Sequence, residues 1–138
     1  MNKIIFYHNV YIEQYSTVVG PIEAEGPLKD GFDLCVSDLY NGCDNYEHAE
    51  IALLEEAYEC LCAKLDNVSF DLAVGGDLMN QLVSSNYTAS EIRIPFLGLY
   101  NACATMAESL IVGATFVDSG GVKNCLCATG SHFSTAER

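Results

Sequence analysis

Basic residues are scarce in this chain, in which Lys and Arg together number 6 against 19 Asp and Glu among 138 residues. The resulting formal net charge of -13 repels phosphate backbones and anionic lipid headgroups, so nucleic-acid binding is excluded as the main role. Association with a membrane would need a partner protein for the same reason. Charged residues are only 18% of the sequence and hydrophobic residues 50%, so a folded core is expected rather than a disordered chain.

Long hydrophobic runs are also missing. No stretch approaches the ~20 apolar residues that a membrane span needs, and the longest, near residues 102–117, is interrupted by Glu108. The start of the chain, MNKIIFYHNVYIEQY, lacks the sustained apolar region and the small-residue cleavage site of a secretory signal. We therefore expect an intracellular protein, with one domain because the length is too short for two ordinary ones.

Cysteines are numerous and odd in number: Cys35, Cys43, Cys60, Cys62, Cys103, Cys125 and Cys127. In an intracellular chain the expected state is reduced, buried thiols. The paired cysteines are spaced C-x-C, and no histidine stands at zinc-finger spacing, so the sequence predicts no metal site. Cys60 and Cys62 would point in different directions on a helix. Cys125 and Cys127 would share one face of a strand, but one such pair is only half of a zinc site.

Hydrophobic patterning predicts alternating strands and helices. The expected elements are a strand region over 3–19, a long loop over 20–45 with one helical turn near 32–39, a helix beginning at 44, a buried strand over 68–75, a short helix over 84–92, a second buried strand over 95–100, a buried helix over 103–118 and a strand over 122–130. This alternation is typical of an α/β fold with a largely parallel sheet.

The two long helices differ in composition. In the first, Asp44 with Glu47 resembles a capping box, and a stripe at helical spacing follows, formed by Ile51, Leu54, Tyr58, Leu61 and Leu65. Its opposite face is expected to be solvated and holds Glu50, Glu55, Glu56 and Glu59. The second, CATMAESLIVGATFVD, is apolar nearly all round, which predicts burial on several sides. A single α/β layer covers such a helix poorly, so we expect the chain to pack against something else.

Cys103 stands at the first turn of the second helix, just beyond a strand end, where open α/β sheets place ligands. A helix N-terminus presents free N–H groups and positive potential, which favour a thiolate or a bound anion. A nucleophile, the wall of a binding pocket and a buried thiol all remain open. His132 follows a strand end and could approach the same pocket, whereas His8 and His48 are expected on the surface. Asn80 also follows a strand end. It could donate a hydrogen bond in the pocket or only stabilise the turn.

Four stretches, in order along the chain, carry a resemblance to a known family: VGPIEAEGPL, GGDLMNQLVSS, IPFLGLYNACAT and ATGSHFSTAER. Together they resemble the stage V sporulation protein AD family, a branch of the thiolase-like superfamily. The resemblance implies a thiolase-like fold built from two βαβαβαββ halves in five layers. Residues 1–138 would form the N-terminal half, with its central helix between two sheets. The second half would supply the other sheet and the His and Asn groups that serve catalysis in thiolases.

The resemblance further implies a protein that binds dipicolinic acid and supports its movement into the developing spore, rather than an enzyme. Cys103 matches the nucleophile position of the superfamily, but no second-half base is present in residues 1–138. No cofactor is expected, although calcium could accompany the ligand. Expected partners are stage V sporulation membrane proteins, which would hold the protein at the inner membrane of the forespore, and a second copy in a homodimer. The alternatives are acyl transfer through Cys103, and a half-fold that self-associates through its uncovered helix.

Overall fold

The computed structural model describes residues 4–131, apart from the side chain of Asn80. Its elements, in chain order, are β1 (Val18–Val19), α1 (Pro21–Ala24), η1 (Lys29–Gly31), β2 (Leu34–Cys35), α2 (Tyr46–Ala63), β3 (Leu72–Gly76), η2 (Asn80–Leu82), α3 (Val83–Ile92), β4 (Phe96–Gly98), η3 (Ala102–Ala104), α4 (Thr105–Asp118) and β5 (Cys125–Thr129). The alternation of strands and helices from α2 onward agrees with the prediction.

The main sheet has three parallel strands in the order β4-β3-β5. Gly75 of β3 pairs with Gly98 of β4, and Gly76 pairs with Thr129 of β5. All three strands therefore end at the same edge of the sheet. The predicted α/β class with a parallel sheet is confirmed, whereas the five-layer thiolase-like architecture stays a prediction.

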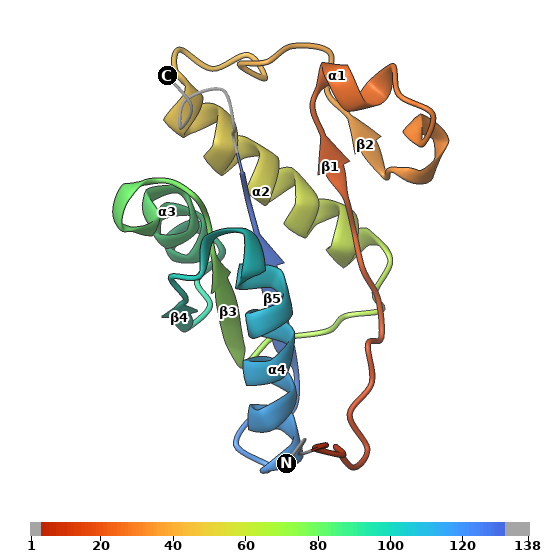
Figure 1. Ribbon diagram of the computed structural model, residues 1–138, viewed down its shortest axis with the longest axis vertical. Coiled ribbons are helices and arrows are strands. Elements are labelled where there is room, and N and C mark those ends of the chain that lie inside the picture. Colours follow the sequence, from red (N-terminus) through yellow and green to blue (C-terminus); the bar gives the residue numbers. More distant parts are fainter. Residues whose placement is uncertain (1–3, 132–138) are drawn as a thin grey trace.

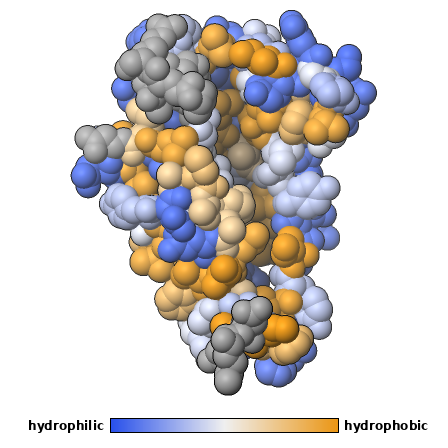
Figure 2. Space-filling view, in the orientation of Figure 1, coloured by the Kyte–Doolittle hydropathy of each residue, from blue (hydrophilic) through white to orange (hydrophobic). Residues whose placement is uncertain are grey.

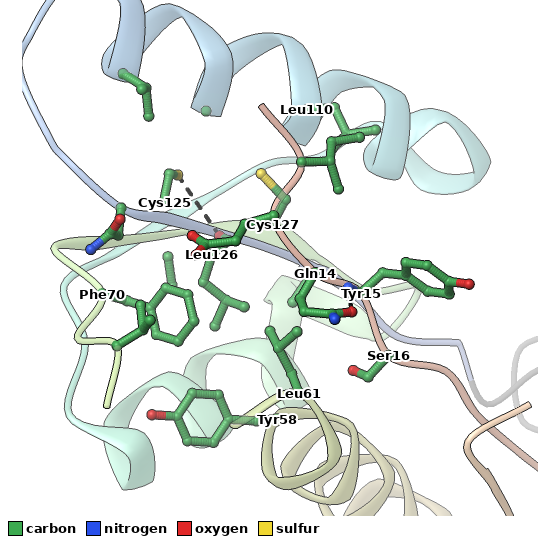
Figure 3. A pocket seen from close by; sticks show the side chains of 18 of the residues that line it. Gln14, Tyr15, Ser16, Tyr58, Leu61, Phe70, Leu110, Cys125, Leu126 and Cys127 are labelled. Carbon is green, nitrogen blue, oxygen red and sulfur yellow. Dashed lines mark hydrogen bonds between the residues drawn. The ribbon is translucent and has the colours of Figure 1, made fainter. Parts of the chain in front are cut away.

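Helices cover both faces of this sheet (Figures 1 and 3). On one face, Leu126 of β5 and Ala73 of β3 pack with Leu61 of α2 in a hydrophobic cluster. Alternate residues of β5 point to the opposite face, so Cys125 and Cys127 lie toward α4 (Figure 3). Because alternate side chains of β5 point to opposite faces of the sheet, α2 and α4 lie on opposite sides of β5.

The N-terminal region differs from its prediction. Within the described part of the expected 3–19 strand region, only Val18–Val19 is a strand, and it pairs with Leu34–Cys35 in a separate two-stranded parallel sheet. The helical turn expected near 32–39 is wrong, because β2 occupies that place. From residue 4 to residue 17 the chain runs along the outside of the molecule, from the bottom of the view up to β1, without regular secondary structure (Figure 1). Local β-propensity is not enough to make a strand, which also needs a partner for its backbone groups.

Helix α2 begins at Tyr46, two residues later than predicted. Its N-cap is Asn45, whose side chain accepts a hydrogen bond of 2.8 Å from the backbone N–H of His48. We predicted that the glutamates of this helix face solvent. This is wrong for Glu50, which is only 1% exposed. Burial, followed by the charges of Glu91 and Glu59, raises the pKa of Glu55. Glu50 lies one helical turn before Leu54, and both side chains approach Gly130, so Glu50 belongs to the buried face of α2 and not to the opposite one.

The helix predicted over 103–118 is present as α4, but it is not buried on several sides as predicted. The buried residues of α4 are Thr105, Ser109 and Gly113, which lie at helical spacing on one face. Large apolar side chains are exposed elsewhere on the helix, namely Met106, Leu110 and Ile111, and Phe116 is exposed near its end. Figure 2 shows hydrophobic surface over the part of the molecule where α4 lies in front. Residues 4–131 therefore leave one apolar face of α4 uncovered, and no helix among them is both long and apolar enough to cross a membrane.

Candidate functional site

The candidate site lies at the edge where the three parallel strands end. The loop after β4 is fixed there by a hydrogen bond of 2.8 Å from Leu99 N–H to Gly75 C=O. The segment after β5 is held by a bond of 3.3 Å from Gly130 N–H to Gly76 C=O. Three loops from adjacent strands are thereby gathered at the carboxyl edge of the sheet, where α/β proteins bind ligands.

Cys103 sits in the loop that follows β4, in the 3-10 turn that leads directly into α4. All seven cysteines lie within the described residues, and only Cys103 is exposed. The buried-thiol alternative is therefore wrong for this residue. The turn is closed by a hydrogen bond of 2.9 Å from Ala104 N–H to Asn101 C=O, and Ala102 adopts a left-handed φ of 44°. This compact turn delivers Cys103 to the N-terminus of a 14-residue helix.

Close packing beneath the turn explains a glycine in β3. A Cβ on Gly76 would overlap the carbonyl oxygen of Leu99 and approach within 3.3 Å of the Thr105 methyl group. Thr105 itself is 2% exposed, and within the described part of the chain its hydroxyl has no hydrogen-bond partner. The floor of the site is thus the bare backbone of β3, with a buried hydroxyl at the first residue of α4.

Asp77 organises the loop after β3 and was not among the predicted site residues. This buried carboxylate accepts bonds of 2.7 Å from the backbone N–H groups of Met79 and Ser85, and one of 2.5 Å from the Ser85 hydroxyl. An aspartate placed directly after a strand-ending Gly-Gly was the available signal, because such a residue readily hydrogen-bonds the backbone two residues on.

The other predicted site residues are only partly placed. Asn80 begins η2 at the carboxyl edge, but its side chain lies outside the described atoms. His132 lies outside the described residues. His8 and His48 are exposed, as predicted. His8 contacts Asp118 at the last residue of α4, so it is roughly 20 Å of helix away from Cys103.

A large cavity lies between the N-terminal segment and the helices. It has a volume of about 920 Å³. Its walls come from residues 7–16, from α2, α3 and α4, and from β5, and they are mainly apolar. Figure 3 shows Tyr58 and Leu61 on one side of the sheet and Leu110 on the other. Cys103 does not line this cavity, whereas Ser85, Met106 and Thr129, which lie near the carboxyl edge, do.

Comparison with known families covers the whole chain: the family model for stage V sporulation protein AD (SpoVAD) matches residues 1–138. The chain belongs to the SpoVAD family. One relative, the stage V sporulation protein AD of Bacillus subtilis (strain 168), is 38% identical over 136 residues. That match covers 97% of this chain and 40% of the relative, so the chain spans well under half of the length of that SpoVAD protein.

The stretches that carried the resemblance to SpoVAD have a clear place in the fold. GGDLMNQLVSS ends β3 and forms the Asp77 loop, and IPFLGLYNACAT contains β4 and the Cys103 turn. The described part of ATGSHFSTAER ends β5. Three of the four SpoVAD-like stretches therefore meet at the carboxyl edge of the sheet, while the fourth forms α1 and its surroundings.

Proposed function

We propose that the carboxyl edge of the sheet binds dipicolinic acid, and that the complete protein supports uptake of this compound into the developing spore. The observation that carries the proposal is the N-terminus of α4, which begins two residues after the exposed Cys103 at an edge shared by three strand ends. Membership of the SpoVAD family supports the sporulation role.

The chemistry of the helix start suits a flat dianion. Its N-cap, Ala104, offers no side chain to satisfy the N–H groups of the first turn. The Thr105 N–H is already bonded to the Ala102 carbonyl oxygen, and the N–H groups that follow it in the first turn, with the helix dipole, attract a carboxylate. In this arrangement Cys103 forms a wall of the pocket rather than a nucleophile, Asn80 follows β3 at the same edge, and His132 would approach from beyond β5.

Calcium would help the ligand to approach so acidic a protein. The formal net charge of -13 repels a dianion, and a divalent cation bound to the ligand offsets that repulsion. Over residues 4–131 no group of three or more His, Cys, Asp or Glu side chains is placed to hold a metal ion. We propose that calcium arrives with dipicolinate.

The proposed cellular setting follows from the same family. A carrier for dipicolinate would act at the inner membrane of the forespore, in contact with stage V sporulation membrane proteins. The uncovered apolar face of α4 fits a further layer of protein, such as the part of the relative that this chain does not span. A homodimer of the complete protein is proposed on the resemblance to thiolase-like proteins alone.

Calorimetric titration of dipicolinate into the full gene product, with and without calcium, tests this function. We expect saturable binding that Cys103→Ala weakens, because the substitution removes one wall of the pocket. Cys43→Ala, in the loop before α2, is a matched cysteine control and should bind as the parent does. Absence of binding under both conditions would overturn the proposal.

Acyl transfer is the second candidate function, and the exposure of Cys103 at a helix start favours it. The thiolate would attack a thioester carbonyl, and the acyl group would pass to the sulfur as coenzyme A leaves. Such a reaction would add the mass of one acyl group to the Cys103 peptide after incubation with an acyl-CoA. If mass spectrometry of the full gene product finds no acylated Cys103, this candidate fails.

A further inference from the structure

Strand β5 forms one edge of the main sheet, and within the described part of the chain its outer side has no partner strand. The order β4-β3-β5 leaves β3 as the strand beside it. The Asn124 carbonyl and the Gly130 N–H, at the two ends of β5, bond toward β3 at 3.0 Å and 3.3 Å. Because backbone groups alternate in direction along a strand, those of Cys125, Cys127 and Thr129 point away from β3. Such a row of unpaired groups is a template for a further strand.

The large cavity runs along this free edge. Every residue of β5 lines it, and the segment 7–16 forms its outer wall. That segment is tied to helices on both faces of the sheet. The Ser16 hydroxyl donates a bond of 2.6 Å to the Ala57 carbonyl of α2, and the His8 N–H donates one of 2.6 Å to the carboxylate of Asp118 in α4. The segment therefore passes in front of β5 (Figure 1), and we call the cavity between them the β5 slot.

The outer wall of the β5 slot also has unpaired backbone groups. Over the described residues, no backbone N–H from Asn9 to Gln14 donates to another backbone group. The sequence there, VYIEQY over 10–15, has the composition of a strand. Two backbones with unpaired groups thus border the slot on opposite sides. A polypeptide between them can bond to both, whereas a small apolar ligand would satisfy neither.

The size and lining of the β5 slot suit a strand. A strand occupies ~4.8 Å within a sheet and ~10 Å between facing layers, with a rise of ~3.3 Å per residue, so five residues fill about 800 Å³. The cavity has a volume of about 920 Å³. Leu61 and Phe70 line it on the α2 side, and Leu110 lines it on the α4 side (Figure 3). A strand in the slot would therefore carry apolar side chains on both faces.

We propose that a β-strand from the part of the SpoVAD polypeptide outside residues 1–138 inserts into the β5 slot, pairs with β5 and extends the main sheet. The match to the Bacillus subtilis relative covers 40% of that protein, so the relative has ample further chain to supply a strand. A second copy of this chain is a poorer occupant, because each copy carries a formal net charge of -13. A separate folded protein would have to release the ties of residues 7–16, whereas a strand of the same polypeptide folds together with them.

Residue-resolved hydrogen exchange on the full gene product tests this proposal. The N–H groups of Cys125 and Cys127 point into the slot, and those of Leu126 and Ala128 point toward β3. We expect all four to exchange at rates within about 10-fold of one another, because each is bonded in the extended sheet. In the 138-residue chain the pair that points into the slot should exchange at least about 100-fold faster than the other pair.

Three results would overturn the proposal. Fast exchange of Cys125 and Cys127 in the full gene product would mean that the edge is unpaired there. Protection that appears only at high protein concentration would assign the slot to a second copy. Equal protection in the 138-residue chain would mean that no strand from outside it is needed and that residues 7–16 close on β5 themselves.

A charge in the wall of the slot tests its apolar lining. Ala57 is half-buried and lines the slot. In the full gene product, Ala57→Asp should raise the exchange rates of Cys125 and Cys127 by about 10–100-fold, because a carboxylate would lie against the apolar strand. Ala63→Asp, at the exposed last residue of α2, is the matched control and should leave the rates unchanged. Equal exchange in the two variants would overturn the apolar occupant. Circular dichroism shows whether each variant folds, and the exchange pattern of the parent protein decides the proposal if Ala57→Asp does not.

Discussion

Ser85 donates two hydrogen bonds to the same oxygen of Asp77, one from its backbone N–H at 2.7 Å and one from its hydroxyl at 2.5 Å. The donor is in the first turn of α3, and the acceptor follows the last residue of β3. A buried carboxylate therefore joins a strand end to a helix start and sets the path of the loop that contains Asn80. Charged hydrogen bonds of this kind are the stronger ones in proteins.

Asp77→Ala should lower the free energy of unfolding by about 3 kcal/mol, because it leaves the buried N–H groups of Ser85 and Met79 without an acceptor. Ser85→Ala should cost less, since the backbone donor remains. Chemical denaturation followed by circular dichroism measures both. Asp66→Ala, on the exposed turn after α2, is the control and should change stability by no more than about 0.5 kcal/mol. Equal effects of Asp77→Ala and Asp66→Ala would contradict the structure.

Gly76→Ala should destabilise the protein by about 3 kcal/mol and displace the Cys103 turn, because the added methyl group meets the Leu99 carbonyl and Thr105. The matched control is Gly31→Ala, where an added Cβ has no neighbour within 4 Å. Thermal unfolding compares the two variants. A Gly76→Ala protein as stable as Gly31→Ala would show that β3 and the turn are not in contact.

Stability should fall in acid partly because of Asp71. The backbone N–H groups of Asn124 and Lys123 donate to its carboxylate and lower its pKa below the usual value of 3.8. The stabilisation is therefore complete above the unfolded pKa and is lost as the pH falls through the lower, folded pKa. Asp71→Asn should flatten the loss of stability below about pH 4. Asp30→Asn, in an exposed turn, is the control, and an unchanged acid profile in Asp71→Asn would refute the assignment.

Cys103 should be the first cysteine of the 138-residue chain to react with iodoacetamide, since the other six are at least partly buried. Peptide mass spectrometry after brief labelling identifies the modified residue. Cys103→Ala should remove the fast phase and leave the slow ones. Faster labelling of Cys125 or Cys127 would mean that the face of β5 is more open than the structure shows.

The 138-residue chain should self-associate through the uncovered face of α4. Ile111 is 57% exposed there, and Ile111→Asp should shift the chain toward monomer because it places a charge in the apolar contact. Sedimentation velocity measures the change. Tyr87→Ser, which removes an exposed aromatic from α3, is the control and should leave association unchanged. A monomeric parent chain would exclude this contact.

Several features could be predicted from the sequence because they depend on local patterns. The stripe of apolar residues fixed α2 to within two residues of its start, and glycine and proline bounded β3 and β4. Cys103 was placed correctly at a helix start after a strand end, because the change from strand to helix period is visible in the sequence itself. The parallel sheet followed from the alternation of elements.

Other features depended on which surfaces meet. Residues 4–17 have strand-like composition but no strand partner, and Glu50 belongs to an acidic run but is buried. The exposure of one apolar face of α4 likewise depends on what the rest of the chain can cover. Asp77 was missed because its three donors come together only when β3, η2 and α3 are folded.

The sequence by itself determined the order of elements, the acidic character and the position of Cys103, since hydrophobic period, charge and turn chemistry act over a few residues. Only the tertiary structure decided the strand order β4-β3-β5, the gathering of three loops at one edge and the joint approach of Cys125 and Cys127 to Gly113. These relationships join residues far apart along the chain, and their free energy exists only after the intervening elements have packed.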